Sequence, residues 1–216
     1  DLMPLILGTN SIKDTGYEVA NSLRFDDDST DYLTRTPSSA GNRQIWTFSA
    51  WVKRSTLGNM RLLSTHDGSN ADNQFTIKFD SSNRLQFYDA PSGSTVSDIT
   101  TNRVFRDVSA WYHIVASLDS TQATASNRIK LYVNGVQETS LAVSTYGSQN
   151  FNTQVNGTNP HQIGRRSDGI QHFDGYMAEV VLIDGQQLDP TSFGEFDSDS
   201  PTIWKPKDVS GLTFGT

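Results

Sequence analysis

Short runs in which apolar and polar residues alternate dominate this chain, and a period of two is that of a strand with one face on a core. The clearest run is 45–53, where Trp46, Phe48, Ala50 and Val52 fall on one side. Smaller or charged residues fill the positions between them. The run predicts a strand whose aromatic side faces the interior.

Further segments carry the same alternation, and their charged or amide side chains fall on the opposite, wetter side. They are 75–79, 85–87, 111–118 and 129–133. The segment 177–183 is instead almost continuously apolar, which is typical of a strand buried on both faces. Many short strands of this kind favour a sandwich or a barrel.

The segments between these runs hold residues that favour tight turns. Residues 80–83 join two predicted strands as a hairpin, and Asn134-Gly135 supplies the two positive-φ positions of a type I′ turn. Only 189–196 is predicted to be helical, with Asp189 as its N-cap and Pro190 in the first position. No internal repeat is visible, which argues against propellers and solenoids.

The composition agrees with an all-β chain and argues against several classes of function. Serine and threonine supply 48 of the 216 residues, and with 16 glycines they favour turns and solvated strands over long helices. The net charge is −7 and the basic residues are scattered, so no concentrated positive surface for nucleic acid is expected. No cysteine is present, which excludes disulfides and thiolate metal sites. The apolar run 2–7 is too short to span a membrane.

Four motifs in a fixed order carry a family resemblance. They are 48–54 (FSAWVKR), 111–116 (WYHIVA), 128–135 (RIKLYVNG) and 173–180 (FDGYMAEV). In this order they resemble the laminin G-like group of concanavalin A-like lectin/glucanase domains, over residues 22–197. The resemblance implies a jelly-roll β-sandwich of two antiparallel sheets, to which the capping pattern adds one short helix.

A narrower resemblance involves both ends of that region. Residues 23–26 with 32–35, and residues 183–193 with 204–206, are similar to versions found in virion proteins of tailed phages. The expected organisation is an N-terminal arm at 1–20, the sandwich at 21–197, and a C-terminal extension at 198–216. The extension resembles the start of a further region in such proteins.

The resemblance also implies what a catalytic version would need. Laminarinase-like relatives place two carboxylates at even spacing on one strand, so that both enter the groove. Here Glu179 and Asp184 are five positions apart, which on a regular strand puts them on opposite faces. The acids at 26–28 have the pattern of a solvated turn, and no Gly-x-Ser-x-Gly motif is present. We therefore expect no enzymatic activity.

Relatives of this group often bind one calcium ion through oxygens on a loop rim, because a hard cation needs many oxygen ligands. The loop candidates are Asp67, Asp72, Asp107 and Asp168. Their spacing singles none of them out, so calcium is the one candidate cofactor and none is assigned. The histidines, His66, His113, His161 and His172, lack metal-ligand spacing, and His113 is expected to be structural.

Candidate ligand-binding residues come from the aromatic and charged residues of three polar connections, 65–74, 146–160 and 165–172. Trp46, Trp51 and Trp111 lie in predicted strands and are expected in the core, whereas Trp204 lies in a loop. The candidates, which could stack on a sugar or fix its hydroxyls, are Asp67, Asp72, Tyr146, Phe151, Arg165, Arg166 and Asp168.

These observations favour a non-catalytic structural protein of the virion surface, either a capsid decoration or a tail-fibre domain, with adhesion to host glycans. A free carbohydrate-binding lectin is the second hypothesis and a glycoside hydrolase the third. The expected partners are other virion proteins or copies of the chain, bound through the N-terminal arm, and a host surface glycan. Neither nucleic acid nor membrane insertion is expected, and the predicted location is the extracellular surface of the particle.

Overall fold

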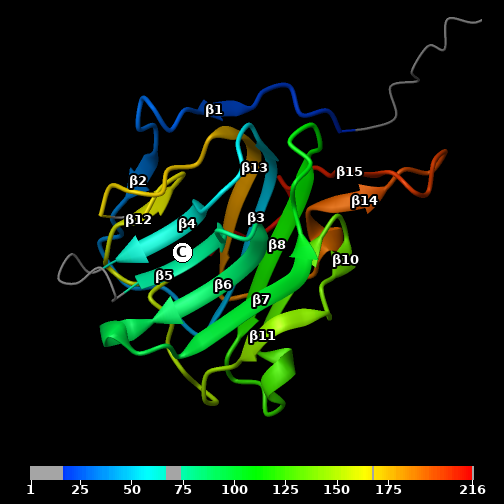
Figure 1. Ribbon diagram of the computed structural model, residues 1–216. Helices are drawn as coiled ribbons and strands as arrows, with labels where there is room; N and C mark the ends of the chain where they lie inside the picture. The colour runs from blue at the N-terminus through cyan, green and yellow to red at the C-terminus, as the bar shows by residue number, and fades with distance from the viewer. Residues whose placement is uncertain (1–16, 67–73, 167, 216) are drawn as a thin grey trace, which may run out of the picture.

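Two antiparallel β-sheets pack face to face in the computed structural model (Figure 1), which describes residues 17–66, 74–166 and 168–215. This architecture confirms the predicted jelly-roll sandwich. Within the described residues no helix is long and apolar enough to cross a membrane.

The first sheet has six strands in the order β1-β13-β3-β8-β9-β10. Their bounds are β1 Leu23–Phe25, β3 Ile45–Arg54, β8 Tyr112–Asp119, β9 Ile129–Val133, β10 Val136–Gln137 and β13 Gly175–Asp184. The predicted strand at 45–53 is the central strand β3, which pairs with both β13 and β8.

The second sheet has seven strands in the order β11-β7-β6-β5-β4-β12-β2. Their bounds are β2 Leu33–Arg35, β4 Met60–His66, β5 Gln74–Phe79, β6 Arg84–Ala90, β7 Ser97–Val104, β11 Leu141–Thr145 and β12 His161–Ile163. In the view of Figure 1 the strands β4 to β7 lie in front, and no described segment crosses over them.

The inward faces of both sheets form one aromatic core, as the alternation predicts. Trp46, Phe48, Ala50 and Val52 are all buried. The Trp46 ring meets rings of the second sheet at centroid distances of 5.4 Å for Phe75 and 5.9 Å for Phe87. Aromatic packing of this kind between sheets is a main source of a sandwich's stability.

The chain after β13 folds back over the outer face of the six-stranded sheet. We call residues 186–215 the C-terminal segment. A second cluster of apolar side chains joins this segment to the sheet and consists of Val115, Ile183 and Phe193, with Tyr132, Val181, Leu188, Val209 and Leu212 packed around them. The hairpin of β14 (Gly194–Phe196) and β15 (Trp204–Pro206) spans the boundary expected at 197–198.

The predicted helix at 189–196 is wrong in length and type. Asp189 does cap it, because its Oδ1 accepts a hydrogen bond from the Thr191 amide at 2.8 Å. The helix is a single 3-10 turn at Pro190–Ser192, however, and the chain then enters β14. Strand pairing with β15 overrides the local helical signal, which illustrates how tertiary contacts outweigh propensity.

Strand β13 is less regular than its apolar sequence predicts. A bulge between Ala178 and Val181 adds a residue against β3, and Glu179 adopts a φ of 49°. Val180 is 38% exposed as a result, so the expectation of burial on both faces is wrong at this point. The type I′ turn is confirmed, since Asn134 has φ 50° and Gly135 has φ 80°.

Candidate functional site

The outer face of the seven-stranded sheet presents polar side chains in register, and we call this surface the polar face. Strand alternation sends Leu85 and Phe87 into the core and turns Gln86 and Tyr88 outward. Cross-strand pairing then aligns the outward residues in two rows. One row is Arg61, Lys78, Gln86 and Thr100; the other is Thr34, Gln162, Ser64, Thr76, Tyr88 and Asp98.

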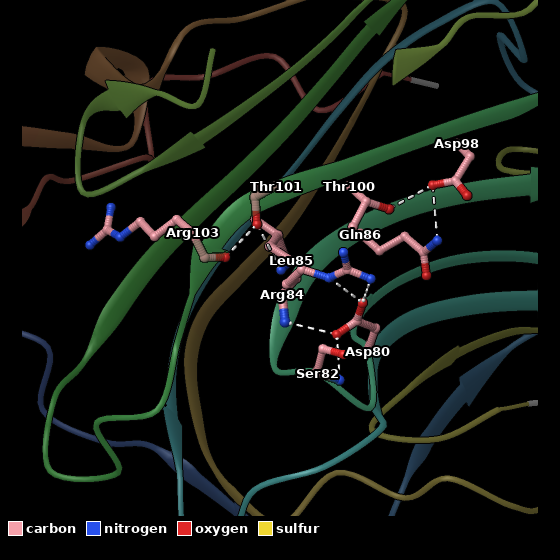
Figure 2. Close-up of polar contacts among 9 residues, drawn as sticks. All are labelled: Asp80, Ser82, Arg84, Leu85, Gln86, Asp98, Thr100, Thr101 and Arg103. Atoms are coloured by element: carbon pink, nitrogen blue, oxygen red, sulfur yellow. Dashed lines mark hydrogen bonds and ion pairs between the residues drawn. The ribbon is translucent and has the colours of Figure 1, made fainter. Parts of the chain in front are cut away.

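Asp98 is the one carboxylate in these two rows of the described chain, and it is held by hydrogen bonds (Figure 2). Gln86 Nε2 donates to Asp98 Oδ1 at 2.9 Å, and Thr100 Oγ1 donates to the same oxygen at 2.7 Å. At the near edge, Asp80 accepts from the Ser82 and Arg84 amides and pairs with the Arg84 guanidinium at 2.7 Å. These bonds fix the β5–β6 turn and the side chains beside it.

Two cations lie at the centre of the polar face without a carboxylate partner among the described residues. Arg61 is 2% exposed and donates only to Thr76 Oγ1 at 3.3 Å and Gln74 Oε1 at 3.5 Å. Burial, together with the charge of Arg166, lowers the pKa of Arg61 to about 9. Burial and the charge of Arg61 lower the pKa of Lys78 to about 8. Both groups remain cationic at neutral pH.

Tyr88 supplies an aromatic surface beside these cations. Its ring is half-buried, its centroid lies 5.9 Å from Lys78 Nζ, and its hydroxyl shares a hydrogen bond of 3.0 Å with Thr95 Oγ1. A fixed aromatic ring flanked by amide and hydroxyl groups is the usual composition of a sugar-binding surface. The polar face therefore has the elements that a glycan requires.

Three of the predicted ligand-binding residues lie beside the polar face. Arg166 forms an ion pair with Asp168, and its Nε donates to Asp168 Oδ1 at 2.7 Å. Both charges act on Arg61, which places the pair at the edge of the face. The Arg165 guanidinium lies 3.3 Å from the Tyr32 ring centroid and donates to Gln162 at 3.0 Å. These interactions preorganise the turn that follows β12.

The other predicted ligand-binding residues do not join them. Phe151 is only 9% exposed and belongs to the main core, while Tyr146 packs against that core and burial raises its pKa. The ring of Phe151 is therefore enclosed by the core and does not offer a face to a sugar. Tyr146 is half-buried and lines a pocket of about 310 Å³ together with residues of β7, β9 and β11, so its role in ligand binding stays a prediction. Asp67 and Asp72 lie outside the described residues.

A pocket of about 330 Å³ lies on the six-stranded sheet and is lined by residues 19–22, Trp51, Trp111, Ala178 and Pro206. Trp111 is 37% exposed, so its expected place in the core is wrong. The reason is its position, since β8 begins at the next residue. Trp51 is buried, as predicted, and its indole nitrogen has no hydrogen-bond partner.

Ser49 and His113 form a buried pair that resembles the nucleophile and general base of a hydrolase. The position of the proton on the His113 ring excludes that role. Trp204 Nε1 lies 2.9 Å from His113 Nδ1, and an indole nitrogen only donates. His113 Nδ1 must therefore accept, which leaves the proton on Nε2 and directs it to Ser49 Oγ at 2.9 Å. His113 cannot take a proton from Ser49 in this state. Burial lowers the pKa of His113 to about 3, so the ring stays neutral and structural, as predicted.

The carboxylates considered for catalysis are engaged in structural contacts. The bulge in β13 removes the regular alternation on which their opposite orientation was predicted. Glu179 Oε2 accepts from the Tyr17 hydroxyl at 2.9 Å. Asp184 Oδ1 accepts from the Asn42 amide at 2.7 Å and Asn156 Nδ2 at 2.9 Å, which ties three segments together.

The loop aspartates considered as calcium ligands accept hydrogen bonds from residues of their own turns. Asp107 Oδ1 accepts from the Ser109 amide and hydroxyl, and these bonds lower its pKa. Within the described residues, one group of three acids comes close enough to share an ion, Asp26-Asp27-Asp28 on an exposed turn. Asp26 there accepts from the Asp28 amide, as in a solvated turn. These contacts therefore do not identify a calcium site among the described residues.

Asp89 is the most perturbed carboxyl among the described residues. It lies on the inward side of β6, fully buried, and neither carboxyl oxygen has a hydrogen-bond partner. Burial raises its pKa to about 7. A general acid must reach a substrate proton, which a fully buried group does not do, so Asp89 bears on stability rather than on ligand chemistry.

Sequence reasoning missed the two cations and the tyrosine of the polar face. Alternation marks Lys78, Gln86 and Tyr88 as outward residues, and that signal is present in the sequence. What the sequence lacks is the register that places Arg61 opposite Lys78 and Thr76 opposite Tyr88. Such a site becomes visible only when strands are paired.

Comparison with known families assigns the fold to a group. The family model of the concanavalin A-like lectin/glucanases superfamily, of laminin G type, matches residues 27–189. This match confirms the resemblance found in the four sequence motifs. By sequence, no curated protein matches the chain significantly.

Solved structures show the same sandwich at low sequence identity. The LG4-5 domains of the mouse laminin α1 chain superpose with a TM-score of 0.55 at 12% identity, covering 81% of this chain and 44% of that one. The enzymatically active domain of bacteriophage CBA120 tailspike protein 2 gives 0.55 at 15% identity, covering 89% and 30%. A pentraxin from Limulus polyphemus gives 0.51 at 13% identity, covering 80% and 74%. The chain spans less than half of the laminin and tailspike chains, and the likeness concerns the fold alone.

Proposed function

The chain belongs to the concanavalin A-like lectin/glucanases superfamily, and from this premise we propose that it is a non-catalytic glycan-binding protein of a phage virion surface. The observation that carries the proposal is the polar face. No described segment crosses its central strands, and Tyr88, Gln86 and Asp98 are held there in fixed positions, partly exposed, while Arg61 and Thr76 beside them are buried. Rigid placement of an aromatic ring and polar groups lowers the entropy that a sugar loses on binding.

The arrangement of carboxylates supports a binding role over hydrolysis. Glycoside hydrolysis in most families uses two carboxyl groups on either side of the scissile bond. In the described part of the two rows, Asp98 stands alone, and its Oδ1 already accepts two hydrogen bonds. A binding surface needs no second carboxylate.

The virion assignment rests on the tailed-phage resemblance at 23–35 and 183–206 and on the shared fold with a phage tailspike domain. The apolar run 2–7 is the part of the sequence for which we propose a partner, either another virion protein or a second copy of this chain. We propose that such a protein is either a capsid decoration protein or a domain of a tail fibre. The extracellular particle surface is common to both.

A glycan array with the purified chain tests the binding proposal. We expect binding to a defined set of glycans, and Tyr88→Ala should weaken it by about 1–3 kcal/mol, the range for a lost stacking contact. Tyr176→Ala is the matched control, because Tyr176 is a half-buried tyrosine on the other sheet. The proposal fails if no glycan binds, or if both variants lose affinity equally.

Two further assays test the remaining parts of the proposal. A reducing-sugar assay on every bound polysaccharide should detect no product, and turnover would contradict the non-catalytic role. Mass spectrometry of purified particles should find the chain at a fixed copy number, and its absence from particles would favour a free lectin.

A further inference from the structure

We propose that the half-buried Lys78, with the buried Arg61 behind it, forms an anion-binding subsite and that the glycan bound on the polar face is acidic, carrying carboxylate or sulfate groups. This inference rests on the proposed glycan-binding function and names the chemistry of the ligand. The two side chains stand on neighbouring strands at directly opposed positions.

The pairing itself breaks a rule of sheet construction. Residues directly opposite in an antiparallel pair are within side-chain contact, and like charges there destabilise the sheet. Arg61 on β4 faces Lys78 on β5 in this way, and the charge of Arg61 lowers the pKa of Lys78. Positions where a fold accepts such a cost are those where function is expected.

A comparison with Arg54 shows that Arg61 is under-bonded. Arg54 is also fully buried, yet its guanidinium donates to the Phe105 carbonyl at 2.6 Å, Asn83 Oδ1 at 2.9 Å and the Gly58 carbonyl at 3.0 Å, and it stacks on a core ring. The Nε atom has no partner in either side chain, but among the described residues the terminal nitrogens of Arg61 make only two long contacts, of 3.3 and 3.5 Å. A buried cation with this little compensation is costly unless an anion joins it.

The nearby carboxylates of the described residues do not supply that anion. Asp168 is paired with Arg166, and Asp80 is paired with Arg84. Asp98 accepts from Gln86 and Thr100 and forms no ion pair with Lys78. Besides each other, the charged groups that act on Arg61 and Lys78 are Arg166, Asp80, Asp98 and Asp168.

These groups balance in number, but the three carboxylates are held by Arg84, by Gln86 and Thr100, and by Arg166, so within the described residues neither of the two opposed cations has an ion pair. An uncharged sugar gains nothing from two desolvated cations, whereas a carboxylate or sulfate neutralises the like-charge pair and forms charge-assisted hydrogen bonds. Tyr88 lies beside Lys78, so one ligand can contact the ring with its sugar and the cations with its acid group.

Equilibrium binding of the full chain to three polymers tests the inference. Dextran sulfate carries sulfate, polygalacturonate carries carboxylate, and dextran is the uncharged control. We expect at least one acidic polymer to bind more than tenfold better than dextran, with affinity falling as salt rises. Lys78→Gln should reduce that binding at least tenfold. Lys130→Gln, a half-buried lysine on the outer side of β9, should leave it unchanged.

A second measurement does not depend on the choice of glycan. NMR titration of the lysine side-chain carbons reports the pKa of Lys78, which burial and Arg61 place at about 8. Saturating sodium sulfate should raise that pKa by half a unit or more and leave the side-chain signals of Lys130 unchanged. An equal response of both lysines, or none, would overturn the subsite.

The two proposals fail in different ways. If neutral glycans bind, Tyr88→Ala weakens them and Lys78→Gln does not, then the polar face binds glycans and the anion subsite is refuted. If sulfate shifts the Lys78 pKa while no glycan binds, the subsite stands and the glycan function is refuted. Equal affinity for dextran and its sulfate would refute the acidic specificity alone.

Discussion

The outer faces of the two sheets start from the same strand alternation and end in different environments. On the six-stranded sheet the C-terminal segment covers the outward residues, so Thr47, Ser49 and His113 are buried. On the seven-stranded sheet no described segment covers the central strands, and Lys78, Gln86 and Tyr88 stay partly exposed. A polar residue that points outward from a strand is thus solvated only if nothing later in the chain returns to it.

The covered face accordingly determines stability and the open face determines binding. Thr47 and His113 on the covered face have protein partners: Thr47 Oγ1 donates to the Gln186 carbonyl at 2.8 Å, and both nitrogens of His113 are engaged, whereas the buried Ser117 hydroxyl opposite Thr47 has none among the described residues. On the open face the two cations lack equivalent partners. Substitutions on the covered face should therefore change mainly stability, and substitutions on the open face should change mainly binding.

The largest effect concerns the protonation of the covered face. His113 has a pKa of about 3 when folded, against about 6.5 when unfolded, so the unfolded chain takes up the proton first as pH falls. Stability from this group is complete above pH ~6.5 and declines by about 1.4 kcal/mol per pH unit below it. We expect His113→Gln to regain about 2–3 kcal/mol relative to wild type between pH 6.5 and 4.5 in urea unfolding.

Asp89 gives the opposite slope and serves as the control. Its folded pKa of about 7 exceeds the unfolded value of 3.8, so its contribution to the free energy of unfolding falls as pH rises from 3.8 to 7. Asp89→Asn should therefore be more stable than wild type at pH 8 and lose that advantage at pH 4. A pH-independent difference for either variant would contradict its assigned burial.

Removing the indole that covers His113 should have an effect of comparable size. Trp204 stacks on the His113 ring at a centroid distance of 5.9 Å and donates to its Nδ1. We expect Trp204→Ala to cost about 2–4 kcal/mol of unfolding free energy, slightly less than a fully buried tryptophan. Trp111→Ala, at an exposed tryptophan, should cost under about 1 kcal/mol by the same denaturation measurement. Equal losses would show that the C-terminal segment does not stabilise the sheet.

A smaller loss should come from a glycine that the same indole touches. A Cβ at position 194 would lie 2.6 Å from ring carbons of Trp204, and a Cβ at Gly135 would crowd the ring equally closely. The ring cannot move away, so Gly194→Ala should cost about 1–3 kcal/mol. Gly211→Ala, where a Cβ meets nothing within 4 Å, should change stability by less than about 0.5 kcal/mol. Matching thermal transitions for the two variants would contradict this packing.

The smallest effect belongs to the open face and has the opposite sign. Lys78→Gln removes a like-charge pair with Arg61, so the free energy of unfolding should rise by about 0.2–1 kcal/mol. Calorimetry at low and high salt checks the cause, because screening should shrink the gain. A loss of stability would mean that Lys78 makes a structural contact on the sheet.

The fold was largely predictable because its signals are local. Alternation at 45–53 and the Asn134-Gly135 turn each arise from neighbouring residues, and both are confirmed. The helix at 189–196 and the regularity of β13 were mispredicted because pairing with β15 and a bulge against β3 decide them. The bulge involves strands far apart in sequence, and the hairpin depends on pairing between strands that a helical capping signal does not reveal.

The site was predictable only in part, for a related physical reason. Arg165, Arg166 and Asp168 lie beside the polar face, as loop residues next to a sheet. Phe151 was misassigned because an aromatic residue in a loop can fold inward as readily as outward. Arg61 required the strand register, which no window of sequence contains.

The close packing of Gly135 and Gly194 against the Trp204 indole limits which substitutions the sequence can accept during evolution. Gly135 needs its positive φ of 80° whatever surrounds it, whereas the structure gives Gly194 only one reason to lack a side chain, namely the indole. A lineage that replaces Trp204 by a smaller residue would free position 194 to accept alanine or serine, while position 135 would remain glycine or asparagine. Substitutions at positions 194 and 204 should therefore occur together among relatives. The change at position 204 should come first, because it makes room for a side chain at position 194.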